Sequence, residues 1–377
     1  MYKEEHKIFR NSLRKFIENE IMPYVESWEE KREIPRSLWK KLGEQGYLCM
    51  WVDEKYGGSG GGFEYSVILT EELTKAGMGI GIPGHSDVIV HYIAEHGEEE
   101  QKERWLPGCT RGDIITSIAM TEPNAGSDVQ AIKTTAARDG DYYVINGQKS
   151  FVTNGMATNL VVLACKIITD AGPSGGGISL FGVEADSPGF SRGRKLDKLG
   201  LHIEDTGELF FDNCRVSKAN LIGEEGMGFT YLMANLQRER LVLTISAQSL
   251  AERILADAIE YSKTREAFGR PIGNHQHNSF KLAEMATEVE LGRAFLDRLT
   301  MDFLAGKDIV TRVSMAKWWV GEMANRIAYN SLQLHGGYGY MEEYPIARLY
   351  RDVRIHTLYG GTTEIMKLII SRNLGFK

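Results

Sequence analysis

One loop of the sequence gathers residues that could hold a polar ligand. The segment from Ala119 to Asp128 follows a predicted strand and has the sequence Ala-Met-Thr-Glu-Pro-Asn-Ala-Gly-Ser-Asp. It supplies hydroxyls, small side chains and exposed backbone amides at a turn, so it can bind a polar group against its backbone. An ordinary Pro/Asn/Gly loop is the competing interpretation of this composition.

A carboxylate on a predicted helix is the second candidate for chemistry. Glu239 lies between Arg238 and Arg240 in a stretch with helical periodicity. A carboxylate can act as a general base if its surroundings raise its pKa from the solution value of about 4.3. Taken alone, a helix glutamate beside two arginines is a surface residue that pairs with one of them.

Metal and nucleic-acid chemistry have little support in the sequence. The four cysteines are far apart and form no CxxC pair, which argues against a zinc site, a disulfide scaffold or an iron–sulfur centre. The net charge of −7 gives no basic footprint for nucleic acid or for an anionic membrane, and it suits a small anionic ligand better. We therefore expect no bound metal, no nucleic acid and a reducing compartment.

The length and the N-terminus limit the architecture. At 377 residues the chain exceeds the usual size of one hydrophobic core, so two or three packed units are expected. The first residues space Ile8, Phe9, Leu13 and Phe16 at helical intervals between charges, unlike the apolar core of a signal peptide. No apolar run has the length needed to span a bilayer, so we expect a cytoplasmic protein that does not enter membranes.

The periodicity changes twice along the chain. It is helical up to about Arg111, with breaks at Gly43, residues 57–62 and residues 77–84. It then becomes strand-like at residues 142–145, 160–163 and 178–181, with turns predicted at Asp139-Gly140 and Asn146-Gly147. Long helical stretches return at residues 229–264, 276–305 and 310–334.

These changes predict an α+β protein of three domains. An N-terminal helical domain covers residues 1–112, a middle antiparallel β-barrel or sandwich covers residues 113–224, and a C-terminal helical bundle covers residues 225–377. A Rossmann domain is not expected, because no alternating strand–helix series follows a GxGxxG turn.

Two long segments resemble signatures of the acyl-CoA dehydrogenase family. They are the loop at residues 119–128 and the segment from Gln333 to Tyr340, which continues through Glu343, Arg348 and Asp352. Shorter pieces at residues 146–155, 265–269 and 359–362 occur in the family's order, so the resemblance covers nearly the whole chain. It implies the family's fold, with a four-helix C-terminal domain, and an FAD enzyme that desaturates a fatty-acyl-CoA between its α and β carbons.

The resemblance also implies where FAD binds. It places the flavin ring against Met120, Thr121 and Ser127, with Phe151 and Thr153 beside it. Many relatives have Trp where Phe151 stands; either ring can cover a flavin face, but the phenyl ring lacks the indole N–H. Packing of Phe151 in the core is the competing interpretation.

A second set of predicted FAD contacts comes from the C-terminal domain. Arg265, Phe268 and Gln276 resemble residues with which a neighbouring subunit holds the pyrophosphate and adenosine, so a homo-oligomer is implied and a tetramer is expected. A diphosphate needs a forked cationic donor and glycine backbone that can approach closely. The remaining predicted contacts are Gln333, Gly336, Gly337, Thr362 and Glu364.

The predicted base departs from the commoner family pattern. Many relatives carry the catalytic glutamate where this chain has Gly360, whereas a second branch, which includes long-chain and isovaleryl-CoA dehydrogenases, carries it at the position of Glu239. The resemblance thus makes Glu239 the base, and it assigns the Gly360 backbone N–H to the thioester oxygen, where negative charge develops. The predicted substrate contacts are Ser127, Arg238, Arg240, Tyr359 and Gly361.

Several functions remain open at this point. The resemblance to the long-chain branch favours a medium- or long-chain substrate and an electron-transfer flavoprotein as electron acceptor. The same fold and base would also serve a branched-chain acyl-CoA or an aminoacyl group on a carrier protein. A non-catalytic acyl-CoA-binding protein and an oxidase that reduces oxygen are further alternatives. The small residues between Gly77 and Gly84 either leave room for an acyl tail or form a glycine-rich turn.

Overall fold

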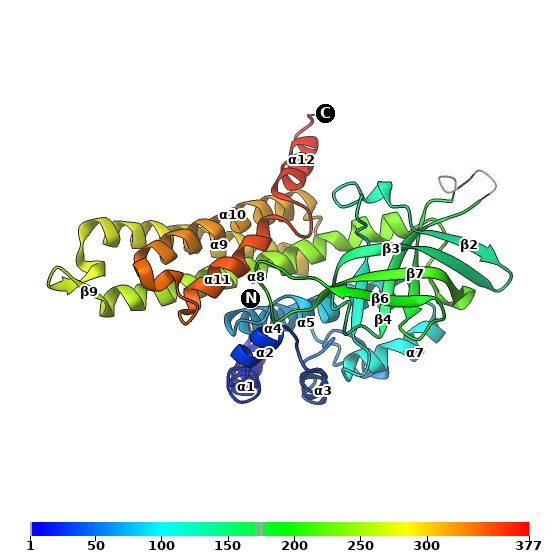
Figure 1. Cartoon of the computed structure of the whole chain (residues 1–377), viewed down its shortest axis with the longest axis horizontal. Coiled ribbons are helices and arrows are strands. Elements are labelled where there is room, and N and C mark those ends of the chain that lie inside the picture. The colour runs from blue at the N-terminus through cyan, green and yellow to red at the C-terminus, as the bar shows by residue number, and fades with distance from the viewer. Residues whose placement is uncertain (1, 170–171, 173–175, 377) are drawn as a thin grey trace.

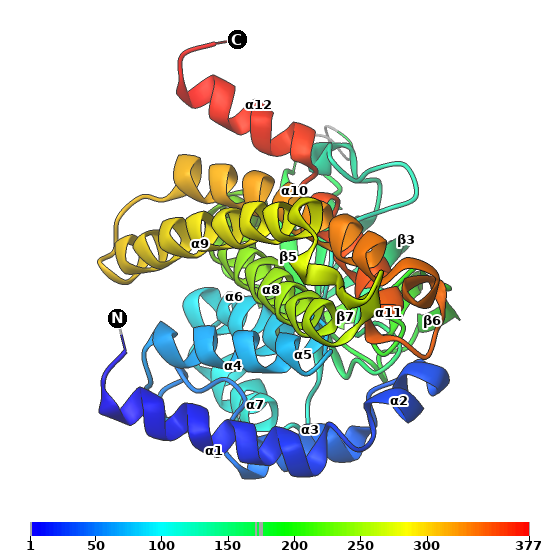
Figure 2. The ribbon, with the colours of Figure 1, turned by 90° about the vertical axis from the view of Figure 1, so that its left-hand side faces the viewer.

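The chain folds into three parts in the predicted order of helices, strands and helices. The computed structural model describes residues 2–169, 172 and 176–376. Figure 1 shows the sheet at one end of the molecule, with the long C-terminal helices extending away from it and the N-terminal helices packed below their junction. Figure 2 shows the same helices from the end of the bundle. The predicted α+β fold class is confirmed.

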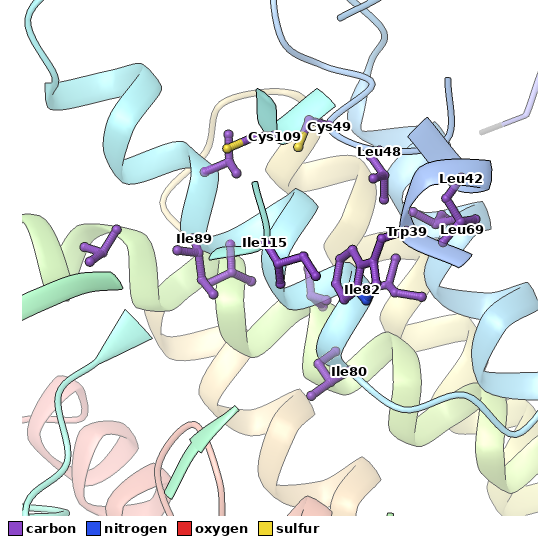
Figure 3. Packing of buried hydrophobic residues seen from close by; sticks show 14 of the residues in the cluster. Trp39, Leu42, Leu48, Cys49, Leu69, Ile80, Ile82, Ile89, Cys109 and Ile115 are labelled. Carbon is purple, nitrogen blue, oxygen red and sulfur yellow. The ribbon is translucent and has the colours of Figure 1, made fainter. Parts of the chain in front are cut away.

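The N-terminal part is helical, and its core continues into buried residues of the middle and C-terminal parts. Its helical elements are α1 (Glu4–Glu20), α2 (Val25–Lys31), α3 (Arg36–Glu44), η1 (Glu54–Tyr56), α4 (Phe63–Lys75), α5 (Gly81–Gly84), η2 (His85–Ile89), α6 (Val90–His96) and α7 (Glu99–Thr110). Figure 3 shows Trp39, Leu42, Leu69 and Ile82 of this core, all buried. Burial of such side chains is the main driving force for this part of the fold.

Helix α4 connects the N-terminal part to the C-terminal bundle. It packs on both α1 and the later helix α8 (Gly228–Thr264), so most of its residues are buried, including Glu71 and Glu72. Arg10 on α1 lies 2.7 Å from Glu71 and 2.5 Å from Glu72, and Arg293 from the bundle lies 2.7 Å from Glu71. Buried carboxylates need such partners, so these ion pairs fix how the two helical parts dock.

The middle part is one mixed β-sheet. Its strands are β1 (Thr116–Ala119), β2 (Thr135–Asp139), β3 (Tyr142–Thr153), β4 (Leu160–Ile167), β5 (Ile178–Glu184), β6 (Phe190–Lys195), β7 (Thr206–Ser217) and β8 (Leu221–Ile222), with short helical turns η3 (Val129–Ala131) and η4 (Lys218–Asn220). The strand order is β6-β7-β3-β2-β4-β5-β8, and β1 pairs with β4. Most pairs are antiparallel as predicted, but β4 is parallel to both β1 and β2.

The two predicted turns of the sheet have different outcomes. Asp139-Gly140 joins β2 to β3 as predicted, and Gly140 has a positive φ of 60°. The turn predicted at Asn146-Gly147 is wrong, because β3 continues through both residues and only its register with β7 shifts there. A Cβ on Gly147 would overlap Thr134, so this glycine allows close packing at a bulge and does not reverse the chain.

The C-terminal part is a bundle of long helices. After α8 come β9 (Glu266–Ala267), β10 (Arg270–Pro271), η5 (Ile272–Asn274), α9 (Gln276–Leu304), α10 (Val310–His335), η6 (Gly336–Tyr340), α11 (Pro345–Val353), η7 (Arg354–Thr357) and α12 (Thr363–Asn373). Helices α8 to α11 share one buried apolar cluster, whereas α12 starts against α10 and projects from the bundle in Figures 1 and 2. The predicted bounds of the three long helices agree with the structure within about two residues.

Two absences concern the described ranges only. Within them, no helix combines the length and the apolar character that crossing a bilayer requires, and no group of three His, Cys, Asp or Glu side chains is arranged to hold a metal ion. The four cysteines are buried and free.

Candidate active site

The carboxyl group of Glu239 lies inside the protein, next to the backbone of Gly360. Glu239 is on α8, and its Oε2 atom is buried without a hydrogen-bond partner among the described residues. A Cβ built on Gly360 would lie 3.6 Å from the Oε1 atom of Glu239. Positions 239 and 360, the two at which a base was considered from the sequence, are therefore neighbours in space. A carboxylate at either position could reach the same part of the site.

The surroundings of the Glu239 carboxyl differ from those of a surface carboxylate. Burial raises its pKa, while the charges of Arg240 and Lys317 act in the opposite direction. In the described part of the chain no ion pair joins Glu239 to either neighbouring arginine. Arg238 pairs instead with Glu95 on α6, at 2.8 Å, and with Asn235. The interpretation of Glu239 as a paired surface residue is thus wrong.

Two cations hold the turn that carries Gly360 and Gly361. The Nε atom of Arg240 donates to the carbonyl of Gly360 at 3.2 Å, and the Nζ atom of Lys317 on α10 donates to the carbonyl of Gly361. Both glycines have positive φ, 61° and 98°, which favours glycine strongly. No acceptor for the Gly360 amide is found among the described residues, so this N–H is free to bind a ligand oxygen.

Tyr359 and His356 complete this buried neighbourhood. The Tyr359 hydroxyl lies 2.9 Å from Nδ1 of His356. Burial raises the pKa of Tyr359, and burial, with a smaller effect of the Lys317 charge, lowers the pKa of His356 to about 3. Both groups are therefore neutral at pH 7. We use the name base cluster for the set Glu239, Arg240, Lys317, Tyr359, Gly360 and Gly361.

Sequence reasoning missed Lys317 and His356, although Lys317 carried a signal. It occupies the stripe of α10 that contains Val313, Val320 and Ala324, all of them buried. A lysine on the apolar face of a predicted helix is unusual, and buried lysines need a specific partner. His356 carried no comparable signal, because it lies in the short turn η7.

The loop predicted to meet the flavin ring is fixed by a buried ion pair. Lys149 on β3 is 0% exposed and donates both to the carbonyl of Met120, at 2.9 Å, and to Glu122, at 2.8 Å. The amide of Ser150 donates to the carbonyl of Thr121. The start of the loop is thus held against β3 before any ligand binds. Lys149 and Glu122 are in the segments that carry the resemblance, but no role had been predicted for them.

Phe151 stands out from the sheet in a strained conformation. It is 69% exposed, which contradicts its interpretation as a core residue, and its φ is +58°. Positive φ is rare for a bulky residue and is tolerated mainly at functional sites. Thr153 ends the same strand, and Ser127 is exposed just before η3. The hydrogen bond from Ser150 to Thr121 thus brings Met120 and Thr121 beside the end of β3, and Ser127 follows in the same loop. We use the name sheet edge for the set Met120, Thr121, Ser127, Phe151 and Thr153.

The predicted FAD contacts between Arg265 and Gly337 gather at the far end of the bundle. Arg265 and Phe268 are in the connection after α8, and Gln276 is the first residue of α9. The guanidinium of Arg265 lies 5.3 Å from the ring of Tyr338, which joins this connection to the turn η6. We use the name distal group for the set Arg265, Phe268, Gln276, Gln333, Gly336 and Gly337.

The distal group is open to solvent. All its members are exposed, Phe268 to 96% and with a φ of +54°, and a Cβ on Gly336 or Gly337 would meet nothing within 4 Å. An exposed forked cation, an exposed ring and bare glycine backbone suit a ligand with both phosphates and an aromatic base. These residues fit FAD, although they are far from the edge of the sheet.

The long helix α8 separates the distal group from the predicted flavin-ring contacts on the sheet. At about 1.5 Å per residue, the stretch from Glu239 to Thr264 is about 38 Å long. Figure 1 shows the sheet near one end of α8 and β9 near the other. One cofactor that contacts both groups within a single chain would therefore have to reach along most of this helix.

Thr362 and Glu364 have a visible local role. The Thr362 side chain accepts a hydrogen bond from the amide of Ile365 at 3.4 Å and caps α12. Glu364 is exposed in the first turn of that helix, where a negative charge is favourable. Both residues follow the base cluster directly in the sequence. Their contacts at the start of α12 give each of them a structural explanation.

Polar side chains from other parts of the chain pack against the glycine-rich segment before η2. A Cβ on Gly79 would overlap the carboxyl of Glu204, and one on Gly81 would lie 2.7 Å from Oδ1 of Asn154. The segment also lines a cavity of about 10 Å³, large enough for one water at most. Gly79 and Gly81 therefore admit these side chains, whereas a Cβ on Gly84 would meet nothing within 4 Å, and room for an acyl tail in this segment stays a prediction.

Comparison with known proteins agrees with this arrangement. Sequence models of the acyl-CoA dehydrogenase family match in three pieces: the N-terminal domain at residues 3–113, the middle domain at residues 117–214 and the C-terminal domain at residues 226–375. The long-chain specific acyl-CoA dehydrogenase of Sus scrofa mitochondria is 43% identical over 375 residues, which cover 99% of this chain and 87% of that protein.

Solved structures give the same result. An acyl-CoA dehydrogenase from Geobacillus kaustophilus superposes with a TM-score of 0.97 at 56% identity and covers 99% of this chain and 98% of its own. A glutaryl-CoA dehydrogenase from Mycobacterium smegmatis, solved in complex with FADH2, superposes with a TM-score of 0.91 at 28% identity and covers 99% of this chain and 95% of its own.

Proposed function

Given that this chain belongs to the acyl-CoA dehydrogenase family, whose members are flavin-dependent oxidoreductases that use FAD, we propose that it desaturates a fatty-acyl-CoA of medium or long chain. The product is the trans-2-enoyl-CoA, and the electrons pass to an electron-transfer flavoprotein. The similarity to a long-chain enzyme over nearly the whole chain supports this substrate class.

One observation carries the proposal. The carboxyl of Glu239 is buried, its Oε2 atom has no partner among the described residues, and it faces the backbone of Gly360. A buried carboxyl that stays unpaired costs free energy, so its retention calls for a function. In our proposal Glu239 removes the proton from the α carbon, and burial raises its pKa toward the range in which a carboxylate is an effective base.

The neighbouring residues complete the reaction geometry. The free N–H of Gly360 donates to the thioester oxygen and stabilises the negative charge that forms there when the α proton leaves. Arg240 holds this turn through the Gly360 carbonyl. When FAD is bound, it supplies the acceptor for the two electrons and the hydrogen that leave the β carbon. Arg238, Ser127, Tyr359 and Gly361 are proposed to contact the acyl-CoA.

The separation within α8 supports an oligomeric enzyme. We propose that each FAD is bound by the sheet edge of one chain and by the distal group of a second chain, in a homotetramer built from such pairs. We also propose that the chain divides into domains at residues 1–112, 113–224 and 225–377. The starts of the matched middle and C-terminal domains, residues 117 and 226, support this division.

Anaerobic titration tests the proposed reaction. The FAD-loaded protein is mixed with saturated acyl-CoAs of 4 to 18 carbons, about eight in all, and flavin absorbance is followed. We expect bleaching, with the fastest rates for medium or long chains, and formation of the enoyl-CoA in equal amount. Absence of bleaching with every CoA ester would refute the proposal, and bleaching only with branched esters would correct the substrate class.

A further inference from the structure

Lys317 is a buried ammonium group without a carboxylate partner. It is 3% exposed on the apolar face of α10. Its Nζ atom donates to the carbonyl of Gly361, and no acidic group lies within ion-pair distance in the described part of the chain. Lysine is almost never fully buried unless it is paired, and a Met of similar shape would fill the same space at lower cost. Packing alone therefore does not explain this residue.

The contact of Lys317 is with the turn that the proposed reaction uses. Gly360 and Gly361 have the widest backbone freedom of any residue type, so their own conformational preferences do not fix the turn. Arg240 from α8 binds the first carbonyl, and Lys317 from α10 binds the second. Two helices thus hold two successive peptide planes. The amide that is proposed to bind the thioester oxygen is the one immediately before them.

The charge of Lys317 also acts on Glu239. The groups that face Lys317 are Glu239 and Arg240 from α8, His356 from η7, and Tyr359, whose ring centre lies 6.0 Å from Nζ. Tyr92 on α6 also faces Glu239. The tyrosines and the histidine are neutral at pH 7, because burial raises the pKa of the former and lowers that of the latter. The positive charges of Arg240 and Lys317 therefore both favour the ionised form of the Glu239 carboxyl.

We propose that Lys317 is a positioning residue for the reaction: it holds the Gly360–Gly361 turn through the Gly361 carbonyl, and its charge favours the ionised form of Glu239. The inference rests on the proposed function. The effect of the Lys317 charge on Glu239 can nevertheless be measured without turnover. In the reaction the α proton moves to Glu239, and Lys317 keeps its own proton throughout. Its charge then also stabilises the enolate-like oxygen near Gly360.

Three substitutions separate the two roles. Lys317→Arg keeps the charge and the donor, Lys317→Gln keeps a donor without charge, and Lys317→Met removes both. Lys367→Met is the matched control, because Lys367 is an exposed lysine on α12 that lies over Trp318 instead. Flavin content and the thermal midpoint of each FAD-loaded protein show first whether the fold is retained.

Infrared titration measures the charge effect directly. The difference between the wild-type spectrum and that of Glu239→Gln isolates the carboxyl of residue 239, and its protonation is followed with pH in each Lys317 background. Loss of a neighbouring cation disfavours the ionised carboxylate, so its pKa should rise by about one unit or more in both Lys317→Gln and Lys317→Met. It should be unchanged in Lys317→Arg and Lys367→Met. An unchanged midpoint in Lys317→Gln would overturn the proposal, even if Lys317→Met fails to fold.

The pH profile of flavin bleaching gives a second readout. Since Glu239 must be ionised to act, its acidic limb in kcat/KM should move to higher pH in Lys317→Gln. Burial, together with the charge of Arg240, lowers the pKa of Lys317 to about 8, so the wild-type profile should also fall above that pH. Arginine does not lose its proton, so this alkaline limb should disappear in Lys317→Arg. Identical profiles in all variants would reduce Lys317 to a structural residue, whereas a wild-type protein that never bleaches would refute the proposed function and leave the infrared result to decide on Lys317.

Discussion

The base cluster and the distal group lie toward opposite ends of one helix and differ in how they are built. In the base cluster, Arg240 and Lys317 are buried and each donates to a backbone carbonyl of the same chain, and the Oε2 atom of Glu239 is buried beside them. In the distal group, Arg265 and Phe268 are exposed. Most polar groups of the base cluster thus have partners within one chain, whereas the distal group is exposed to water, as the proposed binding of FAD between two chains requires.

The largest effect on flavin bleaching is expected at Glu239 in the base cluster. Glu239→Gln should slow anaerobic bleaching by an acyl-CoA about 1,000-fold, because the base is lost, while FAD content stays normal. Glu260→Gln on the same helix is the control, since Glu260 is exposed, and it should bleach like the wild type. Retained bleaching in Glu239→Gln would remove the chemical role of the base cluster.

The turn of the base cluster is expected to tolerate no side chain. A Cβ on Gly360 would overlap Leu243. An alanine at this position would also have to adopt a φ of +61°. Gly360→Ala should therefore slow bleaching about 10- to 100-fold and lower the free energy of unfolding by about 2 kcal/mol. Gly140→Ala has nearly the same φ with open space around it, so it should cost only about 1 kcal/mol and no activity. Equal effects of the two substitutions would show that only backbone strain is involved.

The distal group should affect FAD binding and not the base. Arg265→Ala should raise the dissociation constant of FAD about 10- to 100-fold, because a charged hydrogen-bond donor is lost. Lys263→Ala, at an exposed residue two positions earlier, is the control. Titration of the apoprotein with FAD measures both values.

A mixing experiment tests whether the two regions of one site come from different chains. Glu239→Gln and Arg265→Ala subunits are each defective alone, but a mixed pair has one site with an intact base and an intact distal group. Subunit exchange at equal amounts should restore roughly a quarter of the wild-type sites. No recovery after demonstrated exchange would place both regions of a site in the same chain.

The smallest effect is expected at Phe268. Because its ring is almost fully exposed, Phe268→Ala should change the free energy of unfolding by no more than about 0.5 kcal/mol. Loss of an aromatic contact should still weaken FAD binding about 2- to 10-fold. Ile8→Ala at another exposed apolar residue should change neither quantity. A large loss of stability in Phe268→Ala would mean that this ring already packs within its own chain.

The sequence predicted the architecture well, because long amphipathic helices carry a strong periodic signal. The bounds of α8, α9 and α10 followed from apolar spacing alone, and Gly140 marked a real turn. The turn at Asn146-Gly147 failed, because the same residue pair also suits a bulge, and only its packing against Thr134 decides between them. The parallel pairings of β4 depend on contacts between distant segments, which local patterns do not contain.

The site was predicted less completely than the fold. Family resemblance supplied Glu239 and the glycines, but the closeness of Glu239 to Gly360 and the two carbonyl contacts of Arg240 and Lys317 arise only when α8, α10 and the last turn meet. The same holds for Lys149, whose burial depends on the loop folding back over β3. Single residues whose role comes from three-dimensional convergence leave only weak traces in a linear pattern, such as a lysine on an apolar stripe.

The straight run of α8 between Glu239 and Arg265 also sets a spacing that natural variation has to respect. Insertion of one residue there would rotate everything beyond it by about 100° and shift it by about 1.5 Å along the axis. Neither end would change in composition, yet the distal group would be displaced relative to the base cluster, so in the proposed oligomer it would no longer meet the FAD of the second chain. We therefore expect insertions and deletions to accumulate in surface connections such as the one between α9 and α10, and to be excluded from this segment of helix.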